Sequence, residues 1–238
     1  ELHIALARRT GDPAFDPEPV TAADIANWTE AVQIERQQTL QLLERRRPEW
    51  PDEVAQIAKK VLEAAPALQS RIAAAKTGLA PVHLKTRLHG DLHLGQVLIC
   101  RDDFLIIDFE GEPQRSFDER RAKHSALRDV AGMLRSFDYA RHSALHQTAK
   151  GSADLERLAP LARRWERQLR AAFVQTYRDV TVAATLYADA DAFNAVRPLL
   201  NLFEMEKAMY ELRYEIDNRP DWIGVPLAGL ATLAGLAD

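Results

Sequence analysis

Acidic and amide side chains gather on both sides of a short apolar stretch in the middle of the sequence. Asp91 and Gln96 precede the stretch, and Asp108 and Glu110 follow it. Phosphoryl transfer needs one carboxylate that orients an attacking hydroxyl and accepts its proton, and hard oxygen ligands that hold Mg²⁺ against nucleotide phosphates. This set of residue types fits that chemistry, provided that the fold brings the two groups together.

The apolar stretch is typical of a β-hairpin. Residues 97–100 and 104–107 are two short apolar runs, and Arg101-Asp102-Asp103 between them suits a tight turn. Because a hairpin brings its two ends together, we expect Asp91 and Gln96 to lie close to Asp108. Protein kinases arrange an Asp, an amide five residues later and a second Asp after the next hairpin in the same order.

The sequence supports some of the roles in this set more strongly than others. Asp91 is the predicted catalytic group, with His89 beside it either in catalysis or as an organiser of the loop by hydrogen bonding. Gln96 and Asp108 are the predicted metal ligands, because amide and carboxylate oxygens suit Mg²⁺. Glu110 is either close to the metal or a solvated loop carboxylate.

Simpler interpretations stand beside this one. An isolated His-Gly-Asp segment is weak evidence of a site, and Asp102 and Asp103 suit a turn with no further role. His89 and His93, with Asp91 or Asp108, are an alternative set of ligands for a transition metal. Isolated turns do not explain the ordered Asp–amide–hairpin–Asp set, which favours phosphoryl transfer.

Helical patterns surround the hairpin. Thr21 with Asp24 predicts the capped start of a helix that continues through Leu43, and Asp52 is expected to cap a second one. Another helix is expected to end near Gly78 and Pro81. After a polar loop at 111–125, helices are predicted over 128–140, 155–187 and 190–218, before a final short apolar helix. We therefore expect a mainly α lobe, a helical bundle with one small central β-hairpin.

Composition narrows the function classes. The 238 residues carry 31 basic and 35 acidic side chains, a net charge of −4 that gives no reason to expect nucleic acid. The single cysteine, Cys100, excludes an internal disulfide and is expected to be a small core residue in a reducing cytoplasm. Neither a signal peptide nor a membrane span is predicted. The opening residues suggest a fragment of something longer.

Several segments together resemble the bacterial maltokinases, which are related to aminoglycoside phosphotransferases and protein kinases. They are Glu1–Ala7 leading into Phe15, His89–Leu98, Ile107–Pro113, Arg120–Lys123, Leu127–Ala140, Glu206–Glu215, Asn218–Trp222 and Val225–Leu227. The resemblance covers nearly the whole chain. It implies ATP- and Mg²⁺-dependent phosphorylation of maltose at its anomeric hydroxyl to give maltose 1-phosphate for α-glucan synthesis, and in some bacteria fusion to trehalose synthase. Gln96, where most phosphotransferases have Asn, matches the maltokinase form.

A sugar acceptor needs hydrogen-bonding groups and aromatic platforms. Glu206, Tyr210 and Tyr214 share one face of a predicted helix, with Glu211 alongside, and Trp222 follows after a turn. An aromatic stripe is more often core, but this one also carries carboxylates. Arg128 and Asp129 open a helix after the metal loop; they are expected to form an ion pair that braces the loop, and a contact with the acceptor is the alternative.

The nucleotide lobe is expected to be absent from the chain. A complete kinase needs a glycine-rich turn between strands and a lysine that contacts the phosphates, whereas residues 21–76 are predicted to be helical. We therefore expect residues 1–238 to form a single C-terminal lobe, with catalytic and metal loops at 87–125 and a helical acceptor subdomain at 126–238. Its own N-terminal lobe would be a partner, and the lobe alone is expected to turn over little or no ATP.

Two rival functions remain open. The first is another small-molecule kinase of the same fold, for an aminoglycoside or choline, which would need an anionic or cation–π pocket. The second is a non-catalytic pseudokinase or sugar-binding module. The presence of Asp91, Gln96 and Asp108 disfavours the second, because a pure binding module has no need of a metal set.

Overall fold

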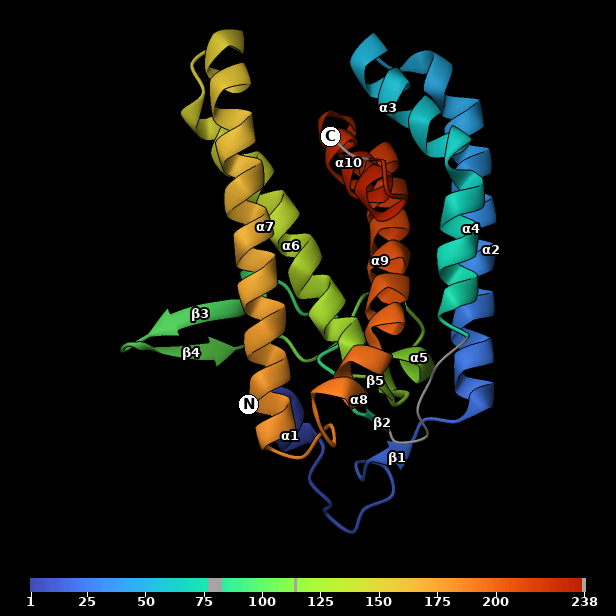
Figure 1. Cartoon of the computed structure of the whole chain (residues 1–238), viewed down its shortest axis with the longest axis vertical. Coiled ribbons are helices and arrows are strands. Elements are labelled where there is room, and N and C mark those ends of the chain that lie inside the picture. Colours follow the sequence, from blue (N-terminus) through green and yellow to red (C-terminus); the bar gives the residue numbers. More distant parts are fainter. Residues whose placement is uncertain (77–82, 114, 237–238) are drawn as a thin grey trace. The chain divides into compact units, whose positions relative to one another are not determined.

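A computed structural model describes residues 1–76, 83–113 and 115–236. The chain divides into two compact units, one formed by Glu1–Val20 with Val82–Asn194 and the other by Thr21–Pro81 with Ala195–Asp238. Each unit is assembled from segments far apart in the sequence, as the chain colouring shows (Figure 1). This division does not test the predicted single lobe, which stays a prediction.

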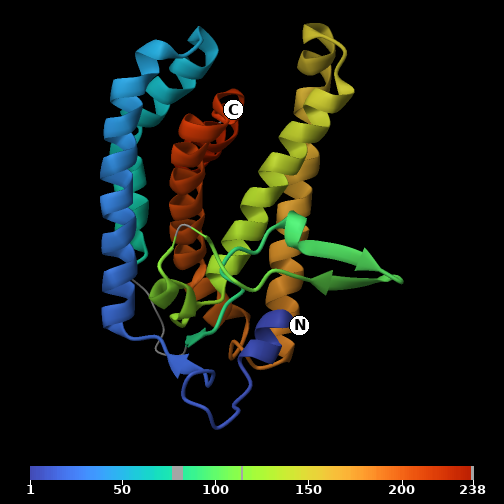
Figure 2. The same cartoon turned by 180° about the vertical axis from the view of Figure 1, so that it is seen from behind.

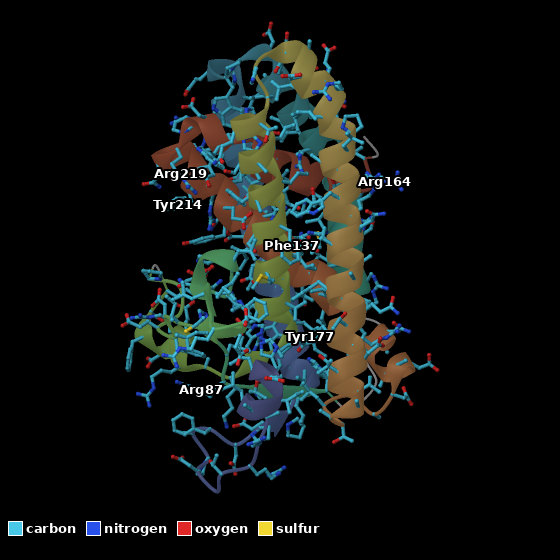
Figure 3. The ribbon with its side chains drawn as sticks, turned by 90° about the vertical axis from the view of Figure 1, so that its left-hand side faces the viewer. Arg87, Phe137, Arg164, Tyr177, Tyr214 and Arg219 are labelled. Carbon is cyan, nitrogen blue, oxygen red and sulfur yellow. The ribbon has the colours of Figure 1, made fainter. Side chains whose placement is uncertain are left out.

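The first unit is built on two long helices, α6 (Leu127–Thr148) and α7 (Ser152–Ala183), which pack against each other. Phe137 on α6 meets Phe173 on α7 edge to face, with ring centroids 5.5 Å apart (Figure 3). The short helix α1 (Leu2–Leu6) lies beside the C-terminal half of α7 (Figures 1 and 2). The unit also contains α5 (Phe117–Arg121) and α8 (Ala190–Ala195).

A small antiparallel sheet joins the two chain segments of the first unit. Its strand order is β1 (Glu18–Pro19), β2 (Leu84–Thr86), β5 (His124–Ser125), so that Lys85 pairs with both Glu18 and Ser125. Just before β2, His83 is buried and shares a hydrogen bond with the Ser125 hydroxyl, Nε2 to Oγ 2.6 Å. The sheet therefore fixes the start of the segment that leads into residues 89–96.

The predicted hairpin is confirmed as β3 (Val97–Cys100) and β4 (Asp103–Ile106), with Val97 opposite Ile106 and Cys100 opposite Asp103. Arg101 and Asp102 form the turn with positive φ at both positions, the geometry of a two-residue type I′ turn. The hairpin projects away from α6 and α7 (Figures 1 and 2). The prediction of Cys100 as a core residue is wrong: its thiol is exposed, because the apolar run lies on this projecting hairpin.

The second unit is entirely helical in the residues that the structure describes. Its elements are α2 (Ala22–Arg46), η1 (Arg47–Glu49), α3 (Asp52–Glu63), α4 (Ala65–Ala74), α9 (Arg197–Asn218), η3 (Pro220–Trp222) and α10 (Gly224–Leu233). Helix α9 is central and packs against α2, α4 and α10. The predicted start of α2 is confirmed, since Thr21 and Asp24 form a reciprocal capping box.

Some helix boundaries differ from the sequence prediction. Asp52 is the first residue of α3 and the cap position belongs to Pro51. The predicted helix over 190–218 is two helices, because Val196 separates α8 from α9. A helix end expected near Gly78 lies outside the described residues. The loop predicted at 111–125 contains α5, whose N-cap Ser116 forms a capping box with Glu119.

No helix in the described part of the chain combines the length and the apolar character needed to cross a membrane.

Candidate active site

The base of the hairpin brings Gln96 and Asp108 together, as predicted. Gln96 closes the short helix η2 (Leu94–Gln96), and its side-chain amide donates to Asp108 Oδ2 at 2.9 Å. The backbone N–H of Ile107 donates to the Gln96 carbonyl at 3.0 Å, which ties the two ends of the hairpin together. Asp108 adopts a positive φ of 66°, a conformation that aspartate tolerates better than most residues and that costs some backbone energy.

His89 connects the segment before the hairpin to the segment after it. Its ring is buried, with Nε2 2.8 Å from the Ile107 carbonyl and Nδ1 accepting the Asp91 backbone N–H at 3.3 Å. A neutral ring with its proton on Nε2 satisfies both contacts. The Asp91 side chain is partly exposed, at 22%, and one of its oxygens lies 4.0 Å from His93 Nε2. His89 thus holds the backbone of Asp91 in register with the residue before Asp108.

One face of helix α6 contacts the loop of residues 89–94. The Asp129 carboxylate accepts the backbone N–H groups of His89 and Gly90, each at 2.9 Å. One turn on, a Cβ added at Gly132 would lie 2.7 Å from the Leu92 carbonyl oxygen, so the loop rests directly on the helix backbone. A further turn on, the Ser136 hydroxyl accepts the Leu94 N–H at 3.2 Å.

These three supporting residues were not among the predicted site residues. Asp129 was expected, with Arg128, to form an ion pair that braces the loop after Asp108 or to contact the substrate; it binds instead the backbone of the loop before the hairpin. Their positions at i, i+3 and i+7 place them on one helix face, and a glycine inside an apolar helix is itself a local signal of close packing. Nothing local in the sequence shows, however, that the partner is a loop about forty residues earlier.

Burial by itself would raise the pKa of the Asp129 carboxyl. The hydrogen bond and charge of His3, with the two backbone amides, outweigh that effect and lower the pKa below its ordinary value. Asp129 is therefore an anion held by directed donors in an enclosed site, which is a rigid arrangement.

The arrangement fits a magnesium ion better than a transition metal. Among the described residues, no three His, Cys, Asp or Glu side chains form a ready-made metal site. Mg²⁺ does not require one, since it is commonly held by one or two protein oxygens together with substrate phosphates and water. The alternative based on His89 and His93 loses support, because both ring nitrogens of His89 and Nδ1 of His93 already have hydrogen-bond partners.

The other predicted site residues of the first unit are Glu110, in the loop after Asp108, and Arg128, at the start of α6. Glu110 is exposed, and its backbone carbonyl accepts a hydrogen bond from Arg120 Nη1 at 3.2 Å. The proposed metal-proximal role of Glu110 stays a prediction. Arg128 is half-buried at the start of α6. Burial lowers the pKa of the neighbouring His124 well below its ordinary value, and the positive charge of Arg128 is the second-largest cause of this lowering.

The predicted sugar contacts, apart from Arg128, belong to the second unit. Along α9, Glu206 and Tyr210 are half-buried, Glu211 is buried and Tyr214 is partly exposed, so the stripe is neither plain core nor plain surface. Lys207 Nζ lies 5.0 Å from the centre of the Tyr210 ring. The four residues share a helix; their contact with an acceptor stays a prediction.

At the end of α9, Arg219 lies close to two of the predicted aromatic residues, Tyr214 and Trp222. Its guanidinium carbon lies 5.5 Å from the centre of the Tyr214 ring and 5.4 Å from that of Trp222. Two nitrogens of Arg219 bind both oxygens of the buried Glu215 at 2.9 and 2.6 Å. Tyr214 and Arg219 lie at the same end of the helix (Figure 3). The two predicted aromatic residues thus flank one anchored cation.

Comparison with known proteins points to sugar kinases. No protein-family model matches the chain. The chain is 32% identical over 237 residues to a glucosamine kinase of Streptacidiphilus jiangxiensis and 29% identical over 238 residues to one of Mycolicibacterium smegmatis. Each alignment covers 98% of the chain but only 46% and 51% of the respective relative. The chain therefore spans about half the length of the curated relatives that it matches.

Solved structures agree with the sequence matches. A glucosamine kinase in complex with glucosamine, ADP and inorganic phosphate matches 98% of the chain and 48% of its own, with a TM-score of 0.73 and 25% identity. A second crystal form of a glucosamine kinase gives the same TM-score at 26% identity. These matches are consistent with the expected kinase-like fold. They support the predicted resemblance at the level of a small-molecule kinase, and maltose specificity is not supported by them.

Proposed function

We propose that this chain is the catalytic and acceptor-binding part of an ATP-dependent sugar kinase. The observation that carries the proposal is the direct contact of Gln96 with Asp108 at the base of one hairpin, at 2.9 Å. Asp91 lies on the preceding loop, which the His89 ring connects to Ile107, the residue before Asp108. An acid, an amide and a second acid in this order are the groups that phosphoryl transfer uses. The homology to glucosamine kinases supports the same reaction class.

Each residue has a separate role in this proposal. Asp91, held by the His89 ring and partly exposed, orients the acceptor hydroxyl and accepts its proton as the oxygen attacks the terminal phosphoryl group. Asp108 and the side-chain oxygen of Gln96 hold Mg²⁺, which would neutralise charge on the nucleotide phosphates. His89 and Asp129 keep the two loops in register, so that the base and the metal ligands face the same substrate.

Glucosamine is the proposed acceptor, in place of the maltose that the sequence resemblance implied. An amino sugar is cationic near neutral pH, and carboxylates with aromatic rings bind an ammonium group well. Helix α9 offers such groups, Glu206 and Glu211 together with Tyr210 and Tyr214. Maltose, phosphorylated at its anomeric hydroxyl, is the second candidate, because the same groups suit a neutral disaccharide.

The nucleotide-binding lobe is proposed to lie outside these 238 residues. Among the described residues, no glycine-rich turn joins two adjacent strands, and the two-residue turn of the hairpin is Arg101-Asp102. The relatives are about twice as long as the aligned region. On this proposal the chain alone turns over ATP weakly or not at all, and the complete protein is the kinase.

The proposal is tested by Asp91→Asn in the complete protein. Loss of the general base is expected to lower kcat roughly 10²–10⁴-fold, measured as ADP release with glucosamine, maltose, an aminoglycoside and choline as separate acceptors. Asp102→Asn is the matched control, because Asp102 is exposed in the hairpin turn at a positive φ that asparagine also tolerates. Near-normal turnover by Asp91→Asn would refute the role of Asp91, and preference for an acceptor other than a sugar would refute the substrate class.

A further inference from the structure

We propose that His3, from the first helix of the chain, is a positioning residue for the catalytic loop and acts through Asp129. The inference rests on the proposed function for its kinetic consequences, but its structural part can be tested without any activity. None of the sequence motifs around Asp91 and Asp108 includes this residue.

His3 lies between helices α6 and α7 and forms a hydrogen bond with each. Its Nε2 lies 3.0 Å from Asp129 Oδ2 on α6, and its Nδ1 lies 3.0 Å from the Tyr177 hydroxyl on α7. The His3 and Tyr177 rings also meet edge to face, with centroids 5.6 Å apart. His3 is 5% exposed and Asp129 2% exposed, so water does not compete appreciably for these bonds. Figure 3 shows Tyr177 on the part of α7 that lies nearest to α1.

The direction of the hydrogen bonds follows from the chemistry of the three groups. Burial, and the nearby Tyr187 and Asp129, raise the pKa of the Tyr177 hydroxyl well above its ordinary value, so Tyr177 keeps its proton. The Asp129 carboxylate can only accept, so His3 Nε2 carries a proton and donates to it. The Tyr177 hydroxyl and His3 Nδ1 share the second hydrogen bond, which fixes the orientation of the ring.

His3 and the loop use the same oxygen of Asp129. Oδ2 accepts from His3 and from the His89 N–H, while Oδ1 accepts from the Gly90 N–H. Removing His3 leaves the carboxylate with only the two loop amides and lets it rotate toward the vacated space. The loop amides follow a carboxylate that is no longer fixed, which makes the His3 contact a determinant of where the loop lies.

The effect would extend to both halves of the site. Gly90 has a φ of +87°, and a Cβ there would lie 3.1 Å from the Gly111 Cα, so the loop backbone packs tightly on the loop after Asp108. The His89 ring bonds the Ile107 carbonyl and the Asp91 N–H. A displacement at residues 89–90 is therefore passed to Asp91 directly and to Asp108 through Ile107. This predicts a loss in kcat, with little change in acceptor KM, because alignment of the reacting groups is lost and substrate contacts are retained.

The test compares His3→Phe with His3→Gln in the complete protein. Phenylalanine keeps a flat ring and loses both nitrogens, whereas the glutamine amide can still donate to Asp129. We expect His3→Phe to lower kcat at least about tenfold with acceptor KM within about threefold, and His3→Gln to restore most of the loss. His146→Gln, at an exposed position of α6, is the control. Equal damage by both His3 variants, or unchanged kcat in His3→Phe, would overturn the proposal.

Amide hydrogen exchange provides the second, activity-independent measurement. The His89 and Gly90 amides should exchange at least about tenfold faster in His3→Phe and near the native rate in His3→Gln. Tyr177→Phe should fall between the two and serves if His3→Phe does not fold. If the complete protein phosphorylates no sugar, the proposed function fails while exchange at His89 and Gly90 still decides the role of His3. Unchanged exchange in both His3→Phe and Tyr177→Phe would refute it.

Discussion

Two neighbouring regions of the first unit are fixed in very different ways. The inner region, residues 83–94 with β5 and α6, is held by buried contacts: Asp129, Gly132 and Ser136 each support the loop. The hairpin, residues 97–106, is held by its own ladder and projects from the unit, with Ile99 81% and Phe104 70% exposed. The predicted catalytic acid Asp91 lies in the inner region, and the predicted metal ligands flank the hairpin.

The difference shows which parts of the candidate site are positioned by contacts within the first unit. The orientation of the Asp91 backbone follows from contacts within the unit, through His89 and Asp129. The two apolar faces of the hairpin, with Leu98 opposite Leu105 on one and Ile99 opposite Phe104 on the other, have no comparable cover from the described residues of their own unit. An isolated two-stranded hairpin is only marginally stable. We therefore expect perturbations of the inner region to cost far more stability than perturbations of the hairpin.

The largest expected effect is the response of the inner region to acid. Burial lowers the pKa of His83 from 6.5 to about 4, and the pKa of His124 is lowered as well. The unfolded chain binds a proton at His83 near pH 6.5, whereas the folded chain does so only near pH 4. The stabilisation that His83 contributes is therefore complete above pH 6.5 and is lost as the pH falls toward 4. Glu166, whose pKa burial raises to about 7, contributes in the opposite direction. At 1.36 kcal/mol per pKa unit, the loss from His83 is about 3 kcal/mol.

Denaturant unfolding between pH 7.5 and 4.5 measures this loss. His83→Gln, whose amide can replace the bond to Ser125, should show a flatter dependence than the native chain over the same range. An equal dependence on pH in the native chain and in His83→Gln would contradict the assignment to His83. The hairpin contains no histidine and should not contribute to this difference.

The second effect is steric and tests the contact between the loop and α6. Gly132→Ala places a methyl group 2.7 Å from the Leu92 carbonyl oxygen, closer than such atoms normally approach. The loop or the helix must move, at a cost of about 1–3 kcal/mol typical of an overpacked core. Because the displaced element carries Asp91, activity of the complete protein should fall together with stability.

The control for this variant is a glycine with room around it. Gly224→Ala, at the first position of α10, meets nothing within 4 Å and should change the unfolding free energy little. Equal stability of Gly132→Ala and the native chain would show that the loop does not rest on the helix as described.

The same comparison explains what the sequence could predict. Thr21 with Asp24 and the hairpin around Arg101-Asp102 are local signals, and both structures form as expected, except that Asp103, predicted in the turn, is the first residue of β4. The proximity of Gln96 to Asp108 was also predictable, because a hairpin fixes it by geometry. In contrast, Asp129 contacts residues forty positions earlier, and no local pattern reports such a contact.

Burial was the least predictable property. The apolar run that ends at Cys100 indicates a strand, and it is one, but an apolar strand in sequence does not show whether anything covers it. His3 is the converse case, a polar residue in a five-residue helix whose burial depends on α6 and α7 folding against it. Both depend on tertiary packing, which helix and strand periodicity do not encode.

The smallest expected effect is on the hairpin itself. Ile99→Thr keeps a β-branched residue in the strand and removes apolar surface that is already 81% exposed, so the free energy of unfolding should change by about 0.5 kcal/mol or less. Val130→Thr in α6 is the matched variant, because Val130 is 1% exposed and its buried hydroxyl should cost about 1–3 kcal/mol. Denaturant unfolding of the two variants measures the contrast directly. Equal losses would mean that the hairpin is packed as firmly as the inner region. A clearly larger loss from Val130→Thr would show that the side of α6, where Asp129 binds the His89 and Gly90 amides, is the more firmly packed of the two.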